Sequence, residues 1–431
     1  MASATAWKGG AASLSRDACA AGTGAMKLLR VDVDRSPDRP SSTRLSGVVR
    51  YDDPRGGPAE ETYWYDVPDA YASSISDSGS PWLAGLLPVA VALGEPLVLS
   101  RPVDPLLLDN APALMAIWHH WYPARKPVAV EADALGAPAL PGGPARTASF
   151  FSGGVDSFHT LLAPRHVPVD DLLLVLGTFD LVSGDDAAYE RVRARLQAAA
   201  DAIGRTLVAV TTNQMKTRMA AADPKYLAGG AMLAAVALVL EPRYTRVLAS
   251  SSVDPGWIEP LGGHPYMTPL HSTRRIRFVE EGFGCSRVAK TELVARNDVA
   301  LAALRACFMS GDETNCGECA KCIRTMIALE ALGVLGRASF GRASLPASRA
   351  ARATVVDGHE RYYYEELPAF CREHGRPDLA RAVERALARS RRHDRFRPLV
   401  RWLRRFPVVG PATHRLEALV QDKGRTTYAP R

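Results

Sequence analysis

The feature that most constrains the fold is a regular alternation of strand-like and helix-like stretches between residues 147 and 252. Four apolar runs have the composition of strands: residues 147–151 (TASFF), 170–179 (DDLLLVLGTF), 205–212 (RTLVAVTT) and 246–252 (RVLASSS). Between them, residues 187–203 carry apolar side chains at helical spacing and residues 228–240 (AGGAMLAAVALVL) are apolar throughout. This alternation predicts an α/β fold, with a doubly wound parallel sheet that is covered by helices on both faces.

A pair of glycines joins the first of these strands to the helix that follows it. Residues 149–157 read SFFSGGVDS. Glycines at such a junction allow the backbone to approach an anion closely, while the free amides and the dipole of the helix point toward it. The alternative is a tight turn in which Asp156 or Ser157 caps the helix. The string matches neither the Walker loop nor the dinucleotide fingerprint.

The string SGGVDS resembles the phosphate-binding loop of the PP-loop, or N-type ATP pyrophosphatase, superfamily, whose members cleave ATP between the α and β phosphates. The resemblance implies a PP-loop (HUP-type) fold in which the loop holds ATP. It also implies that Asp156 helps to hold Mg²⁺. The nucleotide-binding residues that it implies are Ser152, Gly153, Gly154, Val155, Asp156 and Ser157.

Four cysteines lie close together further along the chain, at Cys307, Cys316, Cys319 and Cys322, with spacing C-x8-C-x2-C-x2-C. Four thiolates on a short segment suit a tetrahedral Zn²⁺ that has no open coordination position. The alternatives are an iron–sulfur cluster, a site in which Cys285 replaces Cys307, and cysteines without metal. The sequence therefore predicts a tetracysteine zinc knuckle.

A second resemblance covers roughly residues 146–333. The 7-cyano-7-deazaguanine synthase family within the same superfamily has a similar knuckle, and Thr178, Phe179 and Asp180 resemble its T-F-D motif, which adds these three residues to the predicted nucleotide site. The chain departs from that family after T-F-D, where it reads LVSGDD, and at residues 227–231 (LAGGA). These segments shape the nucleobase pocket of that family, so we expect another substrate.

The resemblance implies an ATP-dependent adenylating enzyme of the ligase or synthase type. It would release AMP and pyrophosphate while it activates a carboxylate or amide oxygen for attack by a nitrogen nucleophile. The catalytic candidates are Asp156, Ser157, Arg287 and Lys290, because cations near the α-phosphate would stabilise the transition state. The alternatives are a sulfurtransferase or tRNA thiolase that uses Cys285, and a nucleotide-binding protein without catalysis.

Residues 250–290 form the candidate segment for substrate recognition, because a polar segment at the carboxyl end of a strand is a common place for function. Its polar and aromatic candidates, besides Arg287 and Lys290, are Asp254, Trp257, His264, His271, Arg274 and Arg275. The alternative for any one of them is a solvated surface position.

Four segments are expected along the chain: a disordered N-terminus (1–25), an α+β domain (26–140), the PP-loop domain with the knuckle (146–345) and a basic helical region (346–431). Strands are expected at residues 28–33, 46–51 and 61–67, and helices at residues 81–93 and 111–121. The last region contains ten arginines and two acidic residues between residues 381 and 405, and we expect its helix to end before Pro398. A solvated helix face is favoured there over nucleic-acid binding.

The composition supports a globular, cytoplasmic protein. Hydrophobic residues make up 47% and charged residues 23% of 431 residues, and the formal net charge is +7. Seven cysteines, an odd number, favour metal binding in a reducing compartment over a disulfide framework. No run approaches ~18 apolar residues, so no membrane span is expected. The expected partners are a small-molecule substrate and a possible second copy of the chain.

Overall fold

The structure is a computed structural model. It describes residues 24–53, 57–136, 145–178, 186–307, 314–355 and 358–403. The N-terminal segment predicted to be disordered lies almost wholly outside these residues, as do Phe179 and Asp180 of the predicted nucleotide site.

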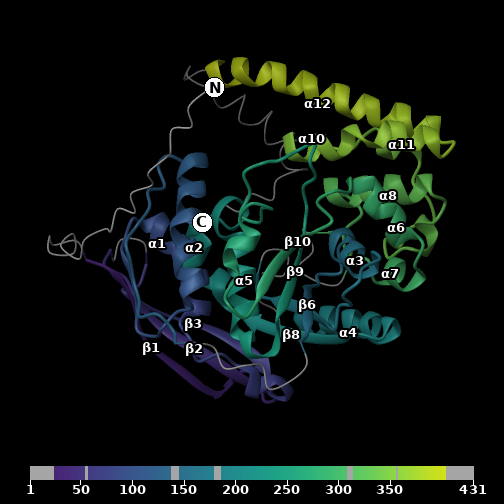
Figure 1. Cartoon of the computed structure of the whole chain (residues 1–431). Helices are drawn as coiled ribbons and strands as arrows, with labels where there is room; N and C mark the ends of the chain where they lie inside the picture. Colours follow the sequence, from purple (N-terminus) through teal and green to yellow (C-terminus); the bar gives the residue numbers. More distant parts are fainter. Residues whose placement is uncertain are drawn as a thin grey trace, which may run out of the picture.

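The described strands form one sheet of ten, in the order β10-β9-β6-β7-β8-β3-β2-β1-β4-β5 (Figure 1). Their bounds are β1 Met26–Arg35, β2 Ser42–Arg50, β3 Glu60–Pro68, β4 Leu97–Leu99, β5 Val130–Glu131, β6 Thr147–Phe150, β7 Asp171–Leu176, β8 Thr206–Thr212, β9 Arg246–Ser250 and β10 Arg277–Glu281. Strands β6 to β10 are parallel to one another, whereas β1, β2 and β3 pair antiparallel and β3 also pairs antiparallel with β8. The predicted α/β class with a mostly parallel sheet is confirmed.

Counted along the chain, the five strands β6 to β10 lie in the order 3-2-1-4-5. The order in which successive strands are added to the sheet therefore changes direction between β6 and β9. These two parallel strands pair through Thr147–Ser149 and Arg246–Leu248. Open sheets of this kind bind ligands outside the carboxyl ends of the strands at the reversal point. The glycine turn lies at this point because it directly follows β6.

The strand β7 shows why the sheet is buried on both sides. Leu173 and Val175 belong to one hydrophobic cluster, whereas Leu172, Leu174 and Leu176 belong to the other. Successive side chains of a strand point to opposite faces, so an uninterrupted apolar run provides both faces with core residues.

Helices cover the two faces. The first cluster contains residues of α1 (Ser80–Leu93), α2 (Pro105–Trp121) and α5 (Gly229–Val239). The second contains residues of the other helices, namely α3 Val155–Leu162, α4 Asp186–Ile203, α6 Arg287–Ala295, α7 Asp298–Ala303, α8 Ala320–Ala331, α9 Ala347–Ala350, α10 Gly358–Glu365, α11 Leu367–Glu373 and α12 Pro377–Leu403.

Some elements differ from the sequence-based expectation, among them α2, β10 and α12. Helix α2 begins six residues earlier than expected, because Asp104 caps it by accepting a hydrogen bond from the amide of Leu106 at 3.0 Å. Strand β10 lies in a segment expected to be a recognition loop, and its sequence, RFVEE, has neither a continuous apolar run nor a strict alternation of polar and apolar residues. Helix α12 continues past Pro398 to Leu403, although a proline inside a helix removes one hydrogen bond and its ring crowds the preceding turn.

The N-terminal strands extend the same sheet. Strand β3 pairs with β8 through Tyr65 with Thr212 and Asp66 with Thr211. This short antiparallel junction connects the strands of residues 26–131 to the parallel strands.

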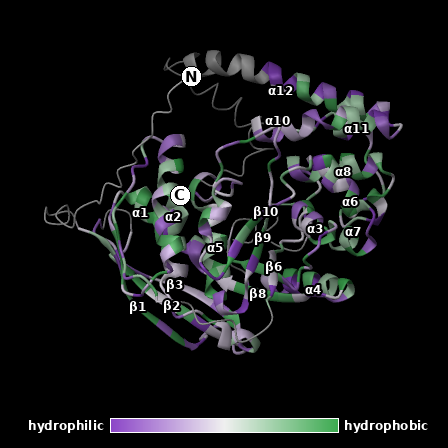
Figure 2. Cartoon of the chain, viewed as in Figure 1, coloured by the Kyte–Doolittle hydropathy of each residue, from purple (hydrophilic) through white to green (hydrophobic). Residues whose placement is uncertain are grey.

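The basic C-terminal region is helical and packs on the second cluster. Leu379, Val383, Ala386 and Leu387 of α12 are buried, a spacing that places them on one helix face. Hydrophilic and hydrophobic residues accordingly alternate along α12 in Figure 2. In Figure 1, α12 lies across α10 and α11. None of the helices in the described part of the chain is long and apolar enough to cross a membrane.

Candidate functional site

The glycine turn has two residues with different conformations. Gly153 has a φ of +76°, which an L-residue rarely adopts, and a Cβ there would lie 2.7 Å from Leu196 Cδ2. Gly154 has a φ of −79° and a ψ of 169°, which any residue can adopt. The turn therefore requires glycine at position 153 for its shape, whereas the shape of the chain does not explain glycine at position 154.

The turn leads directly into α3, whose first turn has no side-chain cap. Ser157 Oγ donates a hydrogen bond to the carbonyl of Gly154 at 3.0 Å, and Ser152 Oγ accepts a long one, 3.4 Å, from the amide of Gly154. Neither Asp156 nor Ser157 caps the helix, so the capping alternative does not hold. The amides at the start of α3 are thus available to an anionic ligand.

Three of the predicted catalytic side chains meet in one ion-pair cluster. Asp156 Oδ2 lies 2.9 Å from Arg287 Nη1, and Asp156 Oδ1 lies 3.5 Å from Lys290 Nζ. The Lys290 side chain is almost completely buried and also donates a hydrogen bond to the carbonyl of Ser251 at 2.8 Å. Since Ser251 follows β9, this contact joins the glycine turn to the neighbouring strand end.

Burial and charge act in opposite directions on Asp156. Burial alone would raise the pKa of its carboxyl group, but Arg287, Lys290 and Arg324 together lower that pKa below its usual value. Burial alone would lower the pKa of Arg287, but Asp156, Tyr363 and Glu360 together raise that pKa above its usual value. Asp156 is therefore an anion at neutral pH, and the basic side chains of Arg287 and Lys290 lie beside it at the first turn of α3.

Two elements that the sequence analysis did not connect with the site complete the cluster. Arg324, on α8, donates a hydrogen bond to Glu360 Oε2 of α10 at 2.7 Å. Its guanidinium carbon lies 4.2 Å from the ring centroid of Tyr363, and that of Arg287 lies 5.2 Å from the same ring. Tyr363 donates a hydrogen bond to the carbonyl of Ser252. The signals in the sequence were an arginine two residues after a cysteine and a run of three tyrosines.

A small cavity of about 10 Å³ lies between α6, α8 and α10, and its lining includes Arg287, Arg324 and Tyr363. This volume is close to the minimum that one water molecule needs. The basic groups are therefore closely packed against α10.

The first part of segment 250–290 does contact this region. Asp254 Oδ1 accepts hydrogen bonds from the hydroxyl group of Tyr362 at 2.5 Å and from the amide of Gly256 at 2.8 Å. Trp257 stacks on Tyr362, with ring centroids 5.3 Å apart. These two predicted recognition residues lie against α10.

The other recognition candidates have structural contacts. His264 is buried between Trp121 and Tyr266, and burial lowers its pKa. Burial likewise lowers the pKa of His271 to about 4. The remaining two candidates are tied to helix ends elsewhere: Arg274 to Asp104, the cap of α2, at 2.9 Å, and Arg275 to the carbonyl of Glu241 at 2.8 Å. The contacts of these four residues therefore support the fold and do not place the residues in the candidate site.

Thr178 is buried just beyond the carboxyl end of β7, the strand beside β6. It is the only member of its predicted motif within the described residues.

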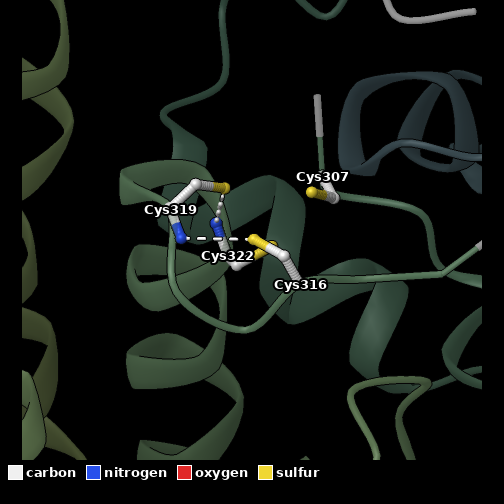
Figure 3. A group of neighbouring side chains, drawn as sticks. All are labelled: Cys307, Cys316, Cys319 and Cys322. Atoms are coloured by element: carbon white, nitrogen blue, oxygen red, sulfur yellow. Dashed lines mark hydrogen bonds between the residues drawn. The ribbon is translucent and has the colours of Figure 1, made fainter. Parts of the chain in front are cut away.

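The four predicted knuckle cysteines converge (Figure 3). The sulfur atoms of Cys307, Cys316, Cys319 and Cys322 all lie within 4.8 Å of one another. The Cys319 amide donates to Cys316 Sγ at 3.3 Å, and the Cys322 amide donates to Cys319 Sγ at 3.4 Å. Cys285 is not part of this group and lies in the turn before α6.

The arrangement fits a single metal ion of the size of zinc. Four sulfurs at about 2.3 Å from a tetrahedral Zn²⁺ lie about 3.8 Å apart, and Cys316 Sγ lies 3.8 Å from Cys322 Sγ. An iron–sulfur cluster places several irons between its ligands and would hold the sulfurs further apart. Without a cation, the neighbouring Cys307 thiol raises the pKa of Cys319 to about 12; a bound metal reverses such an effect.

Within the described residues, the cysteine cluster is the one group of three or more potential metal-ligating side chains close enough to share an ion. Asp156, the predicted Mg²⁺ ligand, therefore belongs to no such group within the described residues. This fits the usual behaviour of Mg²⁺, which binds one or two carboxylates together with phosphates of a substrate.

Comparison of the chain with protein-family models, with curated proteins and with solved structures found no match. The assignment of function therefore depends on the geometry of the site and on the motifs themselves.

Proposed function

We propose that this chain is an ATP-dependent adenylating enzyme with a PP-loop type of site. The observation that carries the proposal is the position of the glycine turn: it lies at the reversal point of a 3-2-1-4-5 sheet, it opens an uncapped helix, and Arg287 and Lys290 converge on its Asp156. This combination of free amides and cations suits a polyphosphate.

In the proposed reaction, a carboxylate or amide oxygen of a small molecule attacks the α-phosphorus of ATP. The bond between the α-phosphorus and the oxygen that bridges to the β-phosphate breaks, and pyrophosphate leaves with the bonding electrons. A nitrogen nucleophile then displaces AMP from the activated substrate and releases a proton. Both products of ATP, pyrophosphate and AMP, are thus accounted for.

Each residue has one role in this proposal. The amides of Val155 to Ser157 and the hydroxyl group of Ser157 would hold the β and γ phosphates, and Gly154 would allow their close approach. Arg287 and Lys290 would move part of their charge from Asp156 to the phosphates as negative charge develops on the leaving group. Asp156, once released, would share the Mg²⁺ that comes with ATP. Zinc in the knuckle would have a structural role, because four cysteines leave it no open position.

The test is a screen for substrate-dependent formation of AMP and pyrophosphate, with metabolite fractions as the source of substrate. Ser157→Ala and Asp156→Asn are the variants; asparagine is preferred to alanine at position 156 because it keeps a polar partner beside the two cations. We expect AMP formation in the wild-type protein and a loss of at least tenfold in each variant. AMP formation that is unchanged in both variants would contradict the proposal.

A second candidate function is sulfur transfer through Cys285. Its side chain is partly exposed and precedes Arg287 by two residues, so a cation lies near in the sequence. Loss of product formation in Cys285→Ala, with AMP formation retained, would favour this candidate. Nucleotide binding without any AMP formation would instead favour a non-catalytic nucleotide-binding protein.

A further inference from the structure

Two stretches of chain that carry cysteine ligands also contact the candidate nucleotide site. The first ends at Cys307 and the second begins at Cys316. A metal bound by all four cysteines would join these two stretches to each other. What each stretch contacts on the other side determines what such a metal would hold in place.

The first stretch contacts the glycine turn. The amide of Arg305, two residues before Cys307, donates a hydrogen bond to the carbonyl of Gly153 at 2.7 Å. Both glycines lie close to Arg305. A Cβ atom added at Gly153 would lie 3.5 Å from Arg305 Cβ, and one added at Gly154 would lie 3.7 Å from the Arg305 carbonyl oxygen. The position of the turn therefore depends on the position of residues 303–305.

Asn315 fastens the two stretches together beside the cysteines. Its Oδ1 accepts hydrogen bonds from the amides of Ala306 at 2.8 Å and Cys307 at 3.0 Å. Its Nδ2 donates to the carbonyls of Leu304 at 2.8 Å and Ser339 at 3.0 Å. Cys316 is the next residue in the chain. A displacement of Cys316 would thus be transmitted through Asn315 to residues 303–305, which contact the glycine turn.

The second stretch contacts the basic cluster. Cys319 caps α8 by accepting a hydrogen bond from the Cys322 amide, so the start of this helix is defined by two metal ligands. Arg324 follows within the same turn and pairs with Glu360 of α10. The carbonyl of Ala320, the first residue of α8, accepts a hydrogen bond from the Tyr364 hydroxyl group at 3.0 Å. Helix α10 is therefore held by the knuckle end of α8.

We infer that the metal-binding knuckle positions the nucleotide site from two sides: through the Arg305 amide it fixes the glycine turn, and through Arg324 it fixes α10 with Tyr363. Arg305 and Arg324 are thus positioning residues, and binding of metal is coupled to the geometry of the site. This inference extends the proposed function, but its first test uses no nucleotide.

The first test is amide hydrogen exchange of the full chain, with zinc bound and after removal of zinc by a chelator. We expect removal to raise the exchange rate at the Arg305 amide and in α10 by at least about fivefold, the low end of typical coupling between sites. Residues 26–50, in β1 and β2, are the internal control and should not change. No change at Arg305 or in α10, or an equal change in residues 26–50, would overturn the inference.

A variant of Arg324 tests the contact with α10 separately from the contact of Arg305 with the glycine turn. Arg324→Lys keeps the charge but loses the planar fork that pairs with Glu360. With zinc bound, it should raise the exchange rate of α10 and leave that of the Arg305 amide unchanged. Arg342→Gln is the matched control, because Arg342 contacts Glu318 of the knuckle at 3.4 Å and is partly exposed. An equal effect of the two variants on α10 would contradict the role of Arg324.

The second test measures the reciprocal effect. A non-cleavable α,β-methylene analogue of ATP with Mg²⁺ should raise the affinity for zinc by about fivefold or more, since coupling between two sites acts equally in both directions. Zinc affinity would be measured by competition with a chromogenic chelator. If the analogue binds and zinc affinity stays the same, the coupling is contradicted. If the analogue does not bind, the proposed function fails, while the hydrogen-exchange result still decides the inference.

Discussion

The two glycines of the turn give a prediction that separates folding from ligand binding. Gly154→Ala adds a methyl group in a conformation that alanine adopts freely, and the nearest atom, Ser152 Oγ, lies 3.4 Å away. Alanine is a poorer N-cap than glycine but restricts the unfolded chain, and these effects of about 0.5–1 kcal/mol largely offset each other. The free energy of unfolding should therefore change by less than about 1 kcal/mol.

The same methyl group occupies the space where the proposed phosphates approach the backbone. We expect the affinity for the Mg²⁺ complex of α,β-methylene ATP to fall at least tenfold, which corresponds to about 1.4 kcal/mol. Gly153→Ala should behave in the opposite way: its φ of +76° costs about 1–2 kcal/mol in alanine, and the contact of 2.7 Å with Leu196 Cδ2 adds strain. Its main effect is therefore on stability.

Urea denaturation measures the stability of each variant, and titration calorimetry measures binding of the analogue. The double variant Gly153→Ala with Leu196→Ala is the control for the contact with Leu196, because it removes that contact and leaves the backbone strain. If Gly154→Ala binds the analogue as tightly as the wild-type protein, the reasoning that position 154 is glycine for the sake of a ligand is refuted.

Further predictions concern the framework around the site. The native His271 resists protonation until pH falls to about 4, whereas an unfolded histidine is protonated below about 6.5, so stability should fall over this window. His271→Leu should remove up to about 3 kcal/mol of that decline, and equal pH dependence of unfolding in both proteins would contradict it. Cys322→Ser should leave less than one equivalent of zinc bound per chain by metal analysis; full retention would contradict the four-cysteine site. Gly282→Ala, at a φ of +75° and with a Cβ 3.1 Å from His159 Nδ1 and 3.3 Å from Lys290 Cε, should lower thermal stability. It should also weaken binding of the analogue by displacing Lys290, and unchanged stability and binding would show that this packing does not matter.

Local patterns were sufficient to predict most of the parallel half of the fold. The apolar run of β7 and the helical spacing of α4, which ends at Gly204 with a φ of +72°, are properties of short segments. The convergence of the four cysteines also followed from their spacing. In each case, the signal lies within a few residues of the structure that it specifies.

The features that were missed depend on contacts between distant segments. Strand β10 has neither a continuous apolar run nor a strict alternation of polar and apolar residues, and it becomes recognisable when β9 is in place beside it. The sheet continues across β3 and β8 through two residue pairs, which no local pattern records. Arg324 and Tyr363 belong to the site because α10 packs against α8, and each residue alone resembles an ordinary helix residue.

The most direct test of the account is a crystal structure of the protein with Mg²⁺ and α,β-methylene ATP. The account predicts that the β and γ phosphates accept hydrogen bonds from the amides of Val155 to Ser157, and that Arg287 or Lys290 contacts a phosphate oxygen. Phosphates bound elsewhere, with the Asp156 ion pairs unchanged, would contradict the assignment of this turn as a nucleotide-binding loop.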